Sequence, residues 1–188
     1  ALDAARERPL AAGMIDAPEL GDPGLVSVII PAWGDFDPTR LRACLKSLLM
    51  QQDARLEILI AEQGFDDPRL TDVADAFGVR HIFERIERPP VEGPERLSPG
   101  RVRNAGIAAS TGQFIYFSDA DIIYADPLHF AKLVAIASRH PDLVLIWPRQ
   151  KHLALEAQDH ACRAFESTGR FDDADIEHAV NGALLANF

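Results

Sequence analysis

The sequence predicts an α/β fold built on a mostly parallel β-sheet, and two observations support this prediction. Segments typical of strands alternate with segments typical of amphipathic helices from Leu25 onward, as they do in layered α/β folds. Asp-Pro pairs stand at the expected starts of three helices, where aspartate suits the N-cap and proline suits the first turn. With 188 residues, of which 47% are hydrophobic, the chain is long enough for one domain with a substantial core.

The first half of the chain contains two strand–helix units. Residues 1–24 mix alanine, charge, proline and glycine without periodicity, so we expect an N-terminal arm or linker before a domain over 25–188. The strand "LVSVIIPAW" precedes a helix after Asp37, whose apolar stripe is Leu41, Cys44, Leu45, Leu48 and Leu49. The strand "LEILIAEQG" precedes a helix that Gly78 closes, whose stripe is Leu70, Val73, Ala74 and Phe77.

The second half continues the alternation. A third strand over 79–86 is followed by a proline-rich, charged loop over 87–97 and by a short helix that starts at Ser98 and Pro99. The segment "GQFIYF" reads as a strand apolar enough to be buried, and Asp126 with Pro127 predicts a helix to about residue 140. We then expect the strand "LVLIWP", the helix "LALEAQDHACRAFES", the polar break "TGRFDDAD" and the apolar segment "AVNGALLANF".

The composition argues against some classes of function. Nucleic-acid-binding proteins carry basic stripes that release counterions, so a net charge of −10 predicts no nucleic-acid partner. The apolar runs are well short of the roughly 20 residues that span a bilayer, so we expect a soluble chain without a membrane span. Cys44 and Cys162 fit neither a zinc-binding spacing nor a disulfide framework, which favours a cytoplasmic location.

Two aspartates follow the strand "GQFIYF" in the tetrapeptide "SDAD". Ligands of parallel α/β sheets bind beyond the carboxyl ends of the strands, and Asp119 and Asp121 occupy such an end. Residues two apart on an extended backbone project to the same side, so both carboxylates could hold Mg²⁺ or Mn²⁺ under a small phosphate group. Alone, the pair is equally compatible with two solvated acids that cap the next loop.

Other polar and aromatic residues strengthen the metal interpretation, because they lie at the ends of neighbouring strands. Trp33 ends the first strand, and Glu62 and Gln63 end the second. Arg101 and Arg103 lie on the helix that leads into the strand before the acids. We therefore expect one polar rim that carries acids, an aromatic ring and a guanidinium group.

These segments resemble the nucleotide-sugar-binding half of family 2 glycosyltransferases, which have the GT-A fold. The resemblance covers the chain from about Leu25 to its end, and it rests on three stretches: "VSVIIPAWGDFDPTRLRACLKSLLMQ", "LEILIAEQG" and "GRVRNAGIAASTGQFIYFSDADI". The last stretch is similar to the family's Arg-Asn-x-Gly helix followed by its DxD strand. The resemblance implies a three-layer α/β/α sandwich with a Rossmann-like, mostly parallel sheet.

The resemblance also assigns residues to the donor nucleotide. It implies that Pro31, Ala32 and Trp33 shape the pocket for the base. Glu62 stands where the family usually has an aspartate that meets the base or ribose, and Gln63 replaces a second common aspartate. An acid that accepts from the uracil N–H would favour UDP, although the two departures leave the identity of the base open.

The same resemblance assigns the phosphate end of the donor. Arg103 matches the family's basic position that faces the nucleotide, while Arg101 is compatible with a solvated helix face. Asp119 would meet the ribose or share the metal, Ala120 would lie against the donor, and Asp121 would be the principal ligand of Mn²⁺ or Mg²⁺.

The implied activity is that of a metal-dependent glycosyltransferase of the hexosyltransferase type. It would transfer a sugar from a nucleotide-diphosphate donor to a hydroxyl of a carbohydrate or other acceptor, with inversion. The family's general base usually follows a segment like "AVNGALLANF", where this sequence ends, so no catalytic base is assigned and the acceptor-side part is expected to be short or missing. Three further acids read as a polar loop: Asp172, Asp173 and Asp175.

Three other functions remain open. The chain could bind a nucleotide sugar without turnover, or it could be a non-catalytic interaction domain. A nucleotidyltransferase would need a glycine-rich, basic loop after the first strand to hold a triphosphate, whereas "PAWGDFDPTR" has one glycine and two acids.

Overall fold

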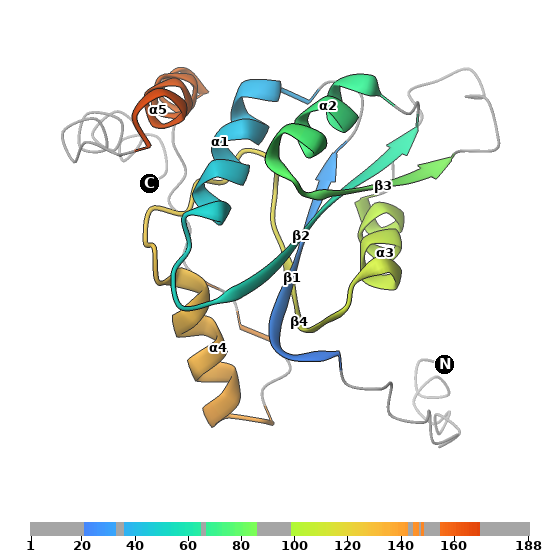
Figure 1. Cartoon of the computed structure of the whole chain (residues 1–188), viewed down its shortest axis with the longest axis vertical. Helices are drawn as coiled ribbons and strands as arrows, with labels where there is room; N and C mark the ends of the chain where they lie inside the picture. Colours follow the sequence, from blue (N-terminus) through green and yellow to red (C-terminus); the bar gives the residue numbers. More distant parts are fainter. Residues whose placement is uncertain are drawn as a thin grey trace, which may run out of the picture.

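The computed structural model describes residues 21–32, 36–64, 67–85, 99–142, 145–146, 148 and 155–169. Its centre is a four-stranded sheet in the order β3-β2-β1-β4 (Figure 1). The strands are β1 (Asp22–Ala32), β2 (Arg55–Gly64), β3 (Arg80–Arg85) and β4 (Gly112–Phe117), and all three pairings are parallel. The predicted parallel α/β sheet is therefore confirmed.

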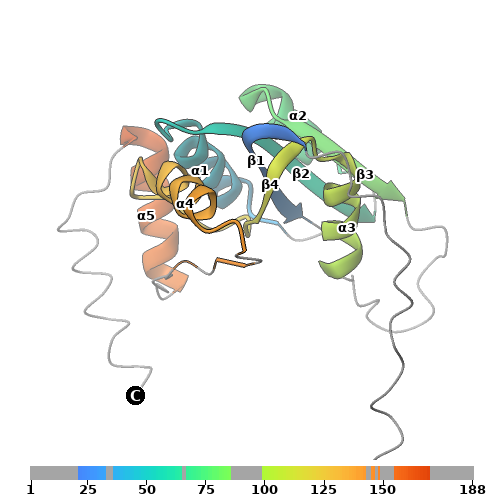
Figure 2. The ribbon, with the colours of Figure 1, turned by 90° about the horizontal axis from the view of Figure 1, so that it is seen from below.

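Helices cover both faces of this sheet. The helices are α1 (Pro38–Leu49), α2 (Pro68–Phe77), α3 (Pro99–Ala109), α4 (His129–Arg139) and α5 (Leu155–Thr168). Helices α1 and α2 lie on one face and α3 lies on the other (Figure 2), which gives the expected three layers. Helix α5 packs on the outer side of α1, where Cys162 and Phe165 contact Ala43.

The core has two parts because β1 is buried on both faces. Val28 and Ile30 pack against the helices α1 and α2, together with Phe130 from the start of α4. Ile29 points to the opposite face and packs with Val102 of α3. A central parallel strand that is covered on both faces usually has a nearly continuous run of apolar residues. Strand β1 has such a run in "VSVII", where only Ser27 is polar. Each fully buried large apolar side chain stabilises the fold by about 1.5–3 kcal/mol.

Two of the predicted helix starts are confirmed by their caps. Asp37 Oδ1 accepts a hydrogen bond from Thr39 N at 2.8 Å, and Asp67 Oδ1 accepts one from Arg69 N at 2.9 Å. Gly78 ends α2 with a left-handed backbone, φ 65°, which a side chain would disfavour.

The third Asp-Pro pair does not start a helix, so that prediction was wrong by two residues. Asp126 Oδ1 accepts from Leu128 N at 3.0 Å, and the Asp126 carbonyl accepts from His129 N at 3.1 Å. The aspartate thus caps a turn over Pro127 and Leu128, and α4 begins only at His129.

Four further expectations need correction. Strand β1 begins at Asp22, inside the expected arm. Leu49, which was expected in the apolar stripe of α1, is exposed, because it is the last residue of the helix and lies roughly 80° around the helix axis from Leu41. Strand β4 is an edge strand of the described sheet with alternating exposure, so it is only half-buried. In the segment "LVLIWP", the described residues 145, 146 and 148 have no strand structure.

Candidate functional site

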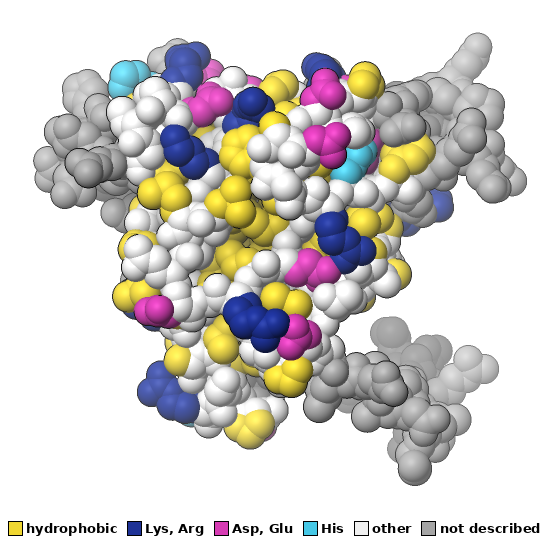
Figure 3. All heavy atoms as spheres, viewed as in Figure 1, with side chains coloured by type: hydrophobic (Ala, Val, Ile, Leu, Met, Phe, Trp, Pro, Cys, Tyr) yellow, Lys and Arg dark blue, Asp and Glu magenta, His cyan; other side chains and the backbone are white. Residues whose placement is uncertain are grey.

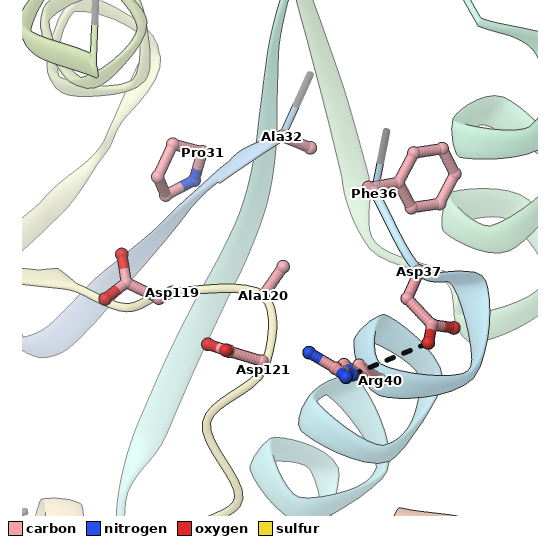
Figure 4. A pocket seen from close by; sticks show the side chains of 8 residues that line it. All are labelled: Pro31, Ala32, Phe36, Asp37, Arg40, Asp119, Ala120 and Asp121. Atoms are coloured by element: carbon pink, nitrogen blue, oxygen red, sulfur yellow. Dashed lines mark ion pairs between the residues drawn. The ribbon is translucent and has the colours of Figure 1, made fainter. Parts of the chain in front are cut away.

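A cavity of about 420 Å³ opens at the carboxyl ends of β1 and β4 (Figure 4). The chain proceeds from β1 to β2 and β3 on one side, then returns to place β4 on the other side. Such a reversal of strand order is the usual ligand-binding position in open α/β sheets. The described lining residues are Pro31, Ala32, Phe36, Asp37, Arg40, Asp119, Ala120 and Asp121.

The end of β1 forms the apolar wall of the cavity. Pro31 and Ala32 are buried and border it, while Trp33 lies outside the described residues. Phe36 adds an aromatic ring that the sequence interpretation missed, and the guanidinium of Arg69 lies 5.0 Å from the centre of this ring. An apolar wall with an aromatic edge suits the face of a nucleobase or ribose.

Asp119 and Asp121 border the cavity, but not by strand alternation. Strand β4 ends at Phe117, and Ala120 and Asp121 lie in a turn that Ile122 N closes on the Asp119 carbonyl at 3.3 Å. Both carboxylates are exposed, and the side chain of Asp119 keeps 59% of its accessible surface. In Figure 4 the two acids lie on the side of the cavity opposite Asp37 and Arg40.

A buried polar network supports the turn from below, and the sequence interpretation missed it. Tyr124 donates through its hydroxyl to Ser118 Oγ at 2.7 Å, and Ser118 Oγ donates to the Asp119 carbonyl at 3.1 Å. The Cys44 thiol also donates to this carbonyl, at 3.6 Å, and Ser47 Oγ accepts from Tyr124 N at 3.1 Å. The sequence signal would have been small polar residues, Ser47 and Ser118, next to apolar core positions.

Burial keeps two members of this network in their protonated, donating form. It raises the pKa of the Cys44 thiol to about 12 and raises the pKa of the Tyr124 hydroxyl above its usual value. Both cysteines of the chain, Cys44 and Cys162, are buried and free. At neutral pH the network therefore holds the acidic turn with neutral hydrogen bonds.

Arg103 lies beside the acidic turn. Its Nη2 atom is 3.5 Å from Asp119 Oδ1, and its guanidinium is 5.8 Å from the centre of the Phe117 ring. Its Nε atom is buried and has no hydrogen-bond partner among the described residues. Because Nε is buried, only the outer nitrogen atoms of this guanidinium are open to an anionic oxygen, and Arg103 is not among the described residues that line the cavity. Arg101, two residues earlier on the same helix, is exposed.

Glu62 lies two residues before the end of β2 and does not border the cavity. Its side chain is 2% exposed, and Glu62 Oε1 accepts from Asp67 N at 2.9 Å. Glu62 Oε2 lies 3.0 Å from His81 Nε2, and Thr71 Oγ1 lies 3.2 Å from His81 Nδ1. Both carboxylate oxygens therefore have protein partners. The backbone of Gln63 belongs to β2, and its side chain lies outside the described residues.

The acidic turn offers the ligands that a hard divalent cation prefers. The described residues contain no group of three or more His, Cys, Asp or Glu side chains that could hold a metal ion by itself. Mg²⁺ commonly uses one or two carboxylates together with substrate phosphates and water. Asp119 and Asp121 fit this pattern, in which the ligand phosphates complete the coordination.

The comparisons with known proteins identify the family of this chain. The family model described as "Glycosyl transferase family 2" matches residues 27–177, so the chain belongs to this family. EpsH of Bacillus subtilis (strain 168), named as a glycosyltransferase, is 32% identical over 139 residues, which are 73% of this chain and 34% of EpsH. YibD of Escherichia coli (strain K12), named as an uncharacterized glycosyltransferase, is 31% identical over 96 residues, which are 51% of this chain and 26% of YibD.

Among solved structures, the crystal structure of S. aureus TarS 1-349 is 21% identical with a TM-score of 0.47, and the match covers 62% of this chain and 33% of TarS. The chain thus spans about a third or less of the length of the curated relatives that it matches. No helix in the described part of the chain is both long and apolar enough to cross a membrane.

Proposed function

We propose that this chain is the donor-binding part of a glycosyltransferase and that its cavity binds a nucleotide-diphosphate sugar together with Mn²⁺ or Mg²⁺. The observation that carries the proposal is that Asp119 and Asp121 meet the buried end of β1 in one cavity, where the strand order reverses. The glycosyltransferase names of EpsH and YibD support the same reaction class.

The roles of the residues follow from their positions. Pro31 and Ala32 form the wall for the nucleoside; Trp33, which the resemblance assigns to the same pocket, lies outside the described residues. Asp121 is the principal metal ligand, and Asp119 shares the metal or meets the ribose. Arg103, beside Asp119, uses the outer nitrogen atoms of its guanidinium for phosphate oxygens. When bound, the metal stabilises the negative charge of the departing nucleoside diphosphate.

The proposed reaction is a direct displacement with inversion. The acceptor hydroxyl oxygen forms a bond to the anomeric carbon, the bond from that carbon to the diphosphate oxygen breaks, and the acceptor proton passes to a general base. None of the described residues is assigned as this base. We propose that the acceptor is a carbohydrate or another hydroxyl compound and that the protein acts in the cytoplasm, where free cysteines such as Cys44 and Cys162 persist.

UDP is the nucleotide that we propose first. Glu62 stays a candidate for the contact with the uracil N–H, because each carboxylate oxygen can accept more than one hydrogen bond. Gln63, at the same strand end, is the second candidate for the base or ribose.

Calorimetric titration of the 188-residue chain with UDP, GDP and CDP, each with and without Mn²⁺, tests the proposal. We expect one nucleotide, UDP, to bind in the presence of Mn²⁺ and at least tenfold more weakly without it. Asp121→Asn should remove this dependence on Mn²⁺, since the change removes the charge of the main metal ligand at an exposed position.

Asp126→Asn is the matched control for this substitution. Asp126 is an exposed aspartate outside the cavity, where it pairs with Lys132 at 2.6 Å. We expect its nucleotide affinity to equal that of the wild type. An Asp121→Asn variant that binds UDP with Mn²⁺ as tightly as the wild type would contradict the assignment of the metal site.

A further inference from the structure

Arg40 contributes a positive charge to the donor cavity from helix α1, and the sequence patterns assign no role to it. It lies in the first turn of α1, and its side chain is 21% exposed. Of the eight described residues that line the cavity, three are acidic and one, Arg40, is basic. Figure 4 places it on the side opposite Asp119 and Asp121.

The guanidinium of Arg40 is held by an acid from another helix. Asp159 of α5 accepts from Arg40 Nη2 at 2.7 Å and from Arg40 Nε at 3.0 Å, through the same oxygen, Oδ1. Asp37 Oδ2 lies 3.5 Å from Arg40 Nε. A guanidinium has five N–H donors, and within the described residues these contacts leave both Nη1–H groups and one Nη2–H without a partner.

The charge of this group is permanent. The hydrogen bond to Asp159 raises the pKa of Arg40 above its usual value, and the negative charges of Asp159, Asp37 and Asp121 act in the same direction. Arg40 and Asp121 line the same cavity, and the charge of Asp121 raises the pKa of Arg40, so the two side chains interact electrostatically. A diphosphate that lies between a metal on the acidic turn and Arg40 would therefore meet positive charge from both sides.

We propose that Arg40 binds the diphosphate of the donor from the side opposite the acidic turn, and that Asp159 is a positioning residue that aims its guanidinium into the cavity. This inference rests on the proposed function, because it assumes that a nucleoside diphosphate occupies the cavity. A planar guanidinium with free N–H groups suits phosphate oxygens better than an ammonium group does. Helix α5 then belongs to the donor site through Asp159, although it does not line the cavity.

A purely structural role for Arg40, as an ion pair between α1 and α5, is the alternative that the experiment must separate. Arg42 provides the matched control, because it lies on the same helix and pairs with Glu166 of α5 at 3.4 Å. Arg42 does not line the cavity. Arg42→Gln therefore removes an ion pair between the same two helices without changing the donor site.

The measurement is the affinity of the 188-residue chain for UDP and for UMP in the presence of Mn²⁺. For Arg40→Gln we expect UDP to bind at least tenfold more weakly and the preference for UDP over UMP to fall. Arg40→Lys should lose part of the affinity, and Asp159→Asn should lose about threefold, since the guanidinium keeps its charge but not its orientation. Arg42→Gln should bind both nucleotides like the wild type.

The outcomes separate this inference from the proposed function. If the wild type binds UDP with Mn²⁺ but Arg40→Gln and Arg40→Lys bind it equally well, the inference is wrong and the proposed function stands. An equal loss in Arg40→Gln and Arg42→Gln would also overturn it, because the loss would then come from the helix contact. A wild type that binds no nucleoside diphosphate would overturn the proposed function and this inference together.

Discussion

Glu62, near the carboxyl end of β2, forms a hydrogen-bonded pair with His81, the second residue of β3. The contacts of Glu62 with Asp67 N and of His81 with Thr71 connect these two strands to helix α2 and its N-cap. The pattern fits a histidine that accepts from the Thr71 hydroxyl at Nδ1 and donates from Nε2 to Glu62. The residue proposed to meet the nucleobase thus also fixes the local structure.

His81→Ala should lower the free energy of unfolding by about 1–3 kcal/mol, because it leaves a buried carboxylate with one hydrogen bond fewer. Urea denaturation followed by circular dichroism measures the change. His140→Ala is the matched control, since His140 is exposed at the end of α4, and we expect little effect there. Equal stability of the two variants would show that the Glu62–His81 contact does not stabilise the fold.

Single residues differ in how well the sequence predicts their place in the site. Asp119 and Asp121 could be recognised because two acids directly after an apolar strand are locally unusual, and both border the cavity. Arg40 could not be recognised, since it reads as one charge on an amphipathic helix. Its position depends on how α1 and α5 pack, and this packing is not encoded in local spacing.

Helix α3 packs against β1 at Gly106, the glycine of the Arg-Asn-x-Gly stretch. A Cβ atom at this position would lie 2.4 Å from Ile29 Cγ2, and Ile29 is fully buried. The absence of a side chain therefore allows the helix to approach the strand closely. The same helix carries Arg103, so the approach also sets the distance between this guanidinium and the acidic turn.

Gly106→Ala should destabilise the protein by about 1–3 kcal/mol, as overpacking does in a well-packed core. It should also weaken Mn²⁺-dependent binding of UDP, because the displaced helix moves Arg103. Thermal melting and the calorimetric titration measure the two effects. Gly100→Ala, at an exposed position in the first turn of α3, should cause neither effect. A Gly106→Ala variant with wild-type stability would contradict the close packing.

Elements were predictable to different degrees, for physical reasons. The caps of α1 and α2 and the apolar stripes of these helices are local features, so their positions agree with the sequence. The start of α4 was missed because Asp126 can cap either a turn or a helix with the same side chain. The half-exposure of β4 was missed because its edge position depends on the order of strands, which apolar content does not reveal.

At the scale of the whole molecule, the side chain of Glu57 on β2 forms hydrogen bonds to β1, to β3 and to the residue before β4. Its carboxylate accepts from Ser27 Oγ of β1 at 2.6 Å, from Thr111 N just before β4 at 2.8 Å, and from Arg80 of β3. Burial raises the pKa of Glu57, but these hydrogen bonds outweigh it and hold the pKa below the usual 4.5. The folded protein therefore binds this proton less readily than the unfolded chain.

The sign of the pH dependence follows from this lowered pKa. The contribution of Glu57 to stability is present above about pH 4.5 and is lost as the pH falls through the lower pKa of the folded state. Glu57→Gln should therefore be less stable than the wild type at pH 6, and the difference should shrink towards pH 3. Urea denaturation at pH 6, 5, 4 and 3 measures it. A difference that is constant over this range would contradict the role of Glu57.

The charge distribution of the whole molecule bears on its anionic ligand. On the face shown in Figure 3, apolar side chains gather in the middle, with helices α1 and α2 on one side of them and helix α4 on the other. Basic and acidic side chains lie next to each other on the same face. The net charge of −10 opposes the approach of a diphosphate. Local positive charge from Arg40, Arg103 and a divalent metal would offset it at the cavity.

The most direct test of this account is the affinity of the wild-type chain for UDP with and without Mn²⁺, measured by calorimetry. The account predicts binding that is at least tenfold tighter with Mn²⁺, because the carboxylates of Asp119 and Asp121 repel the diphosphate unless a cation lies between them. Equal affinity in both conditions, or no binding of any nucleoside diphosphate, would contradict the claim that the acidic turn is a metal-dependent donor site.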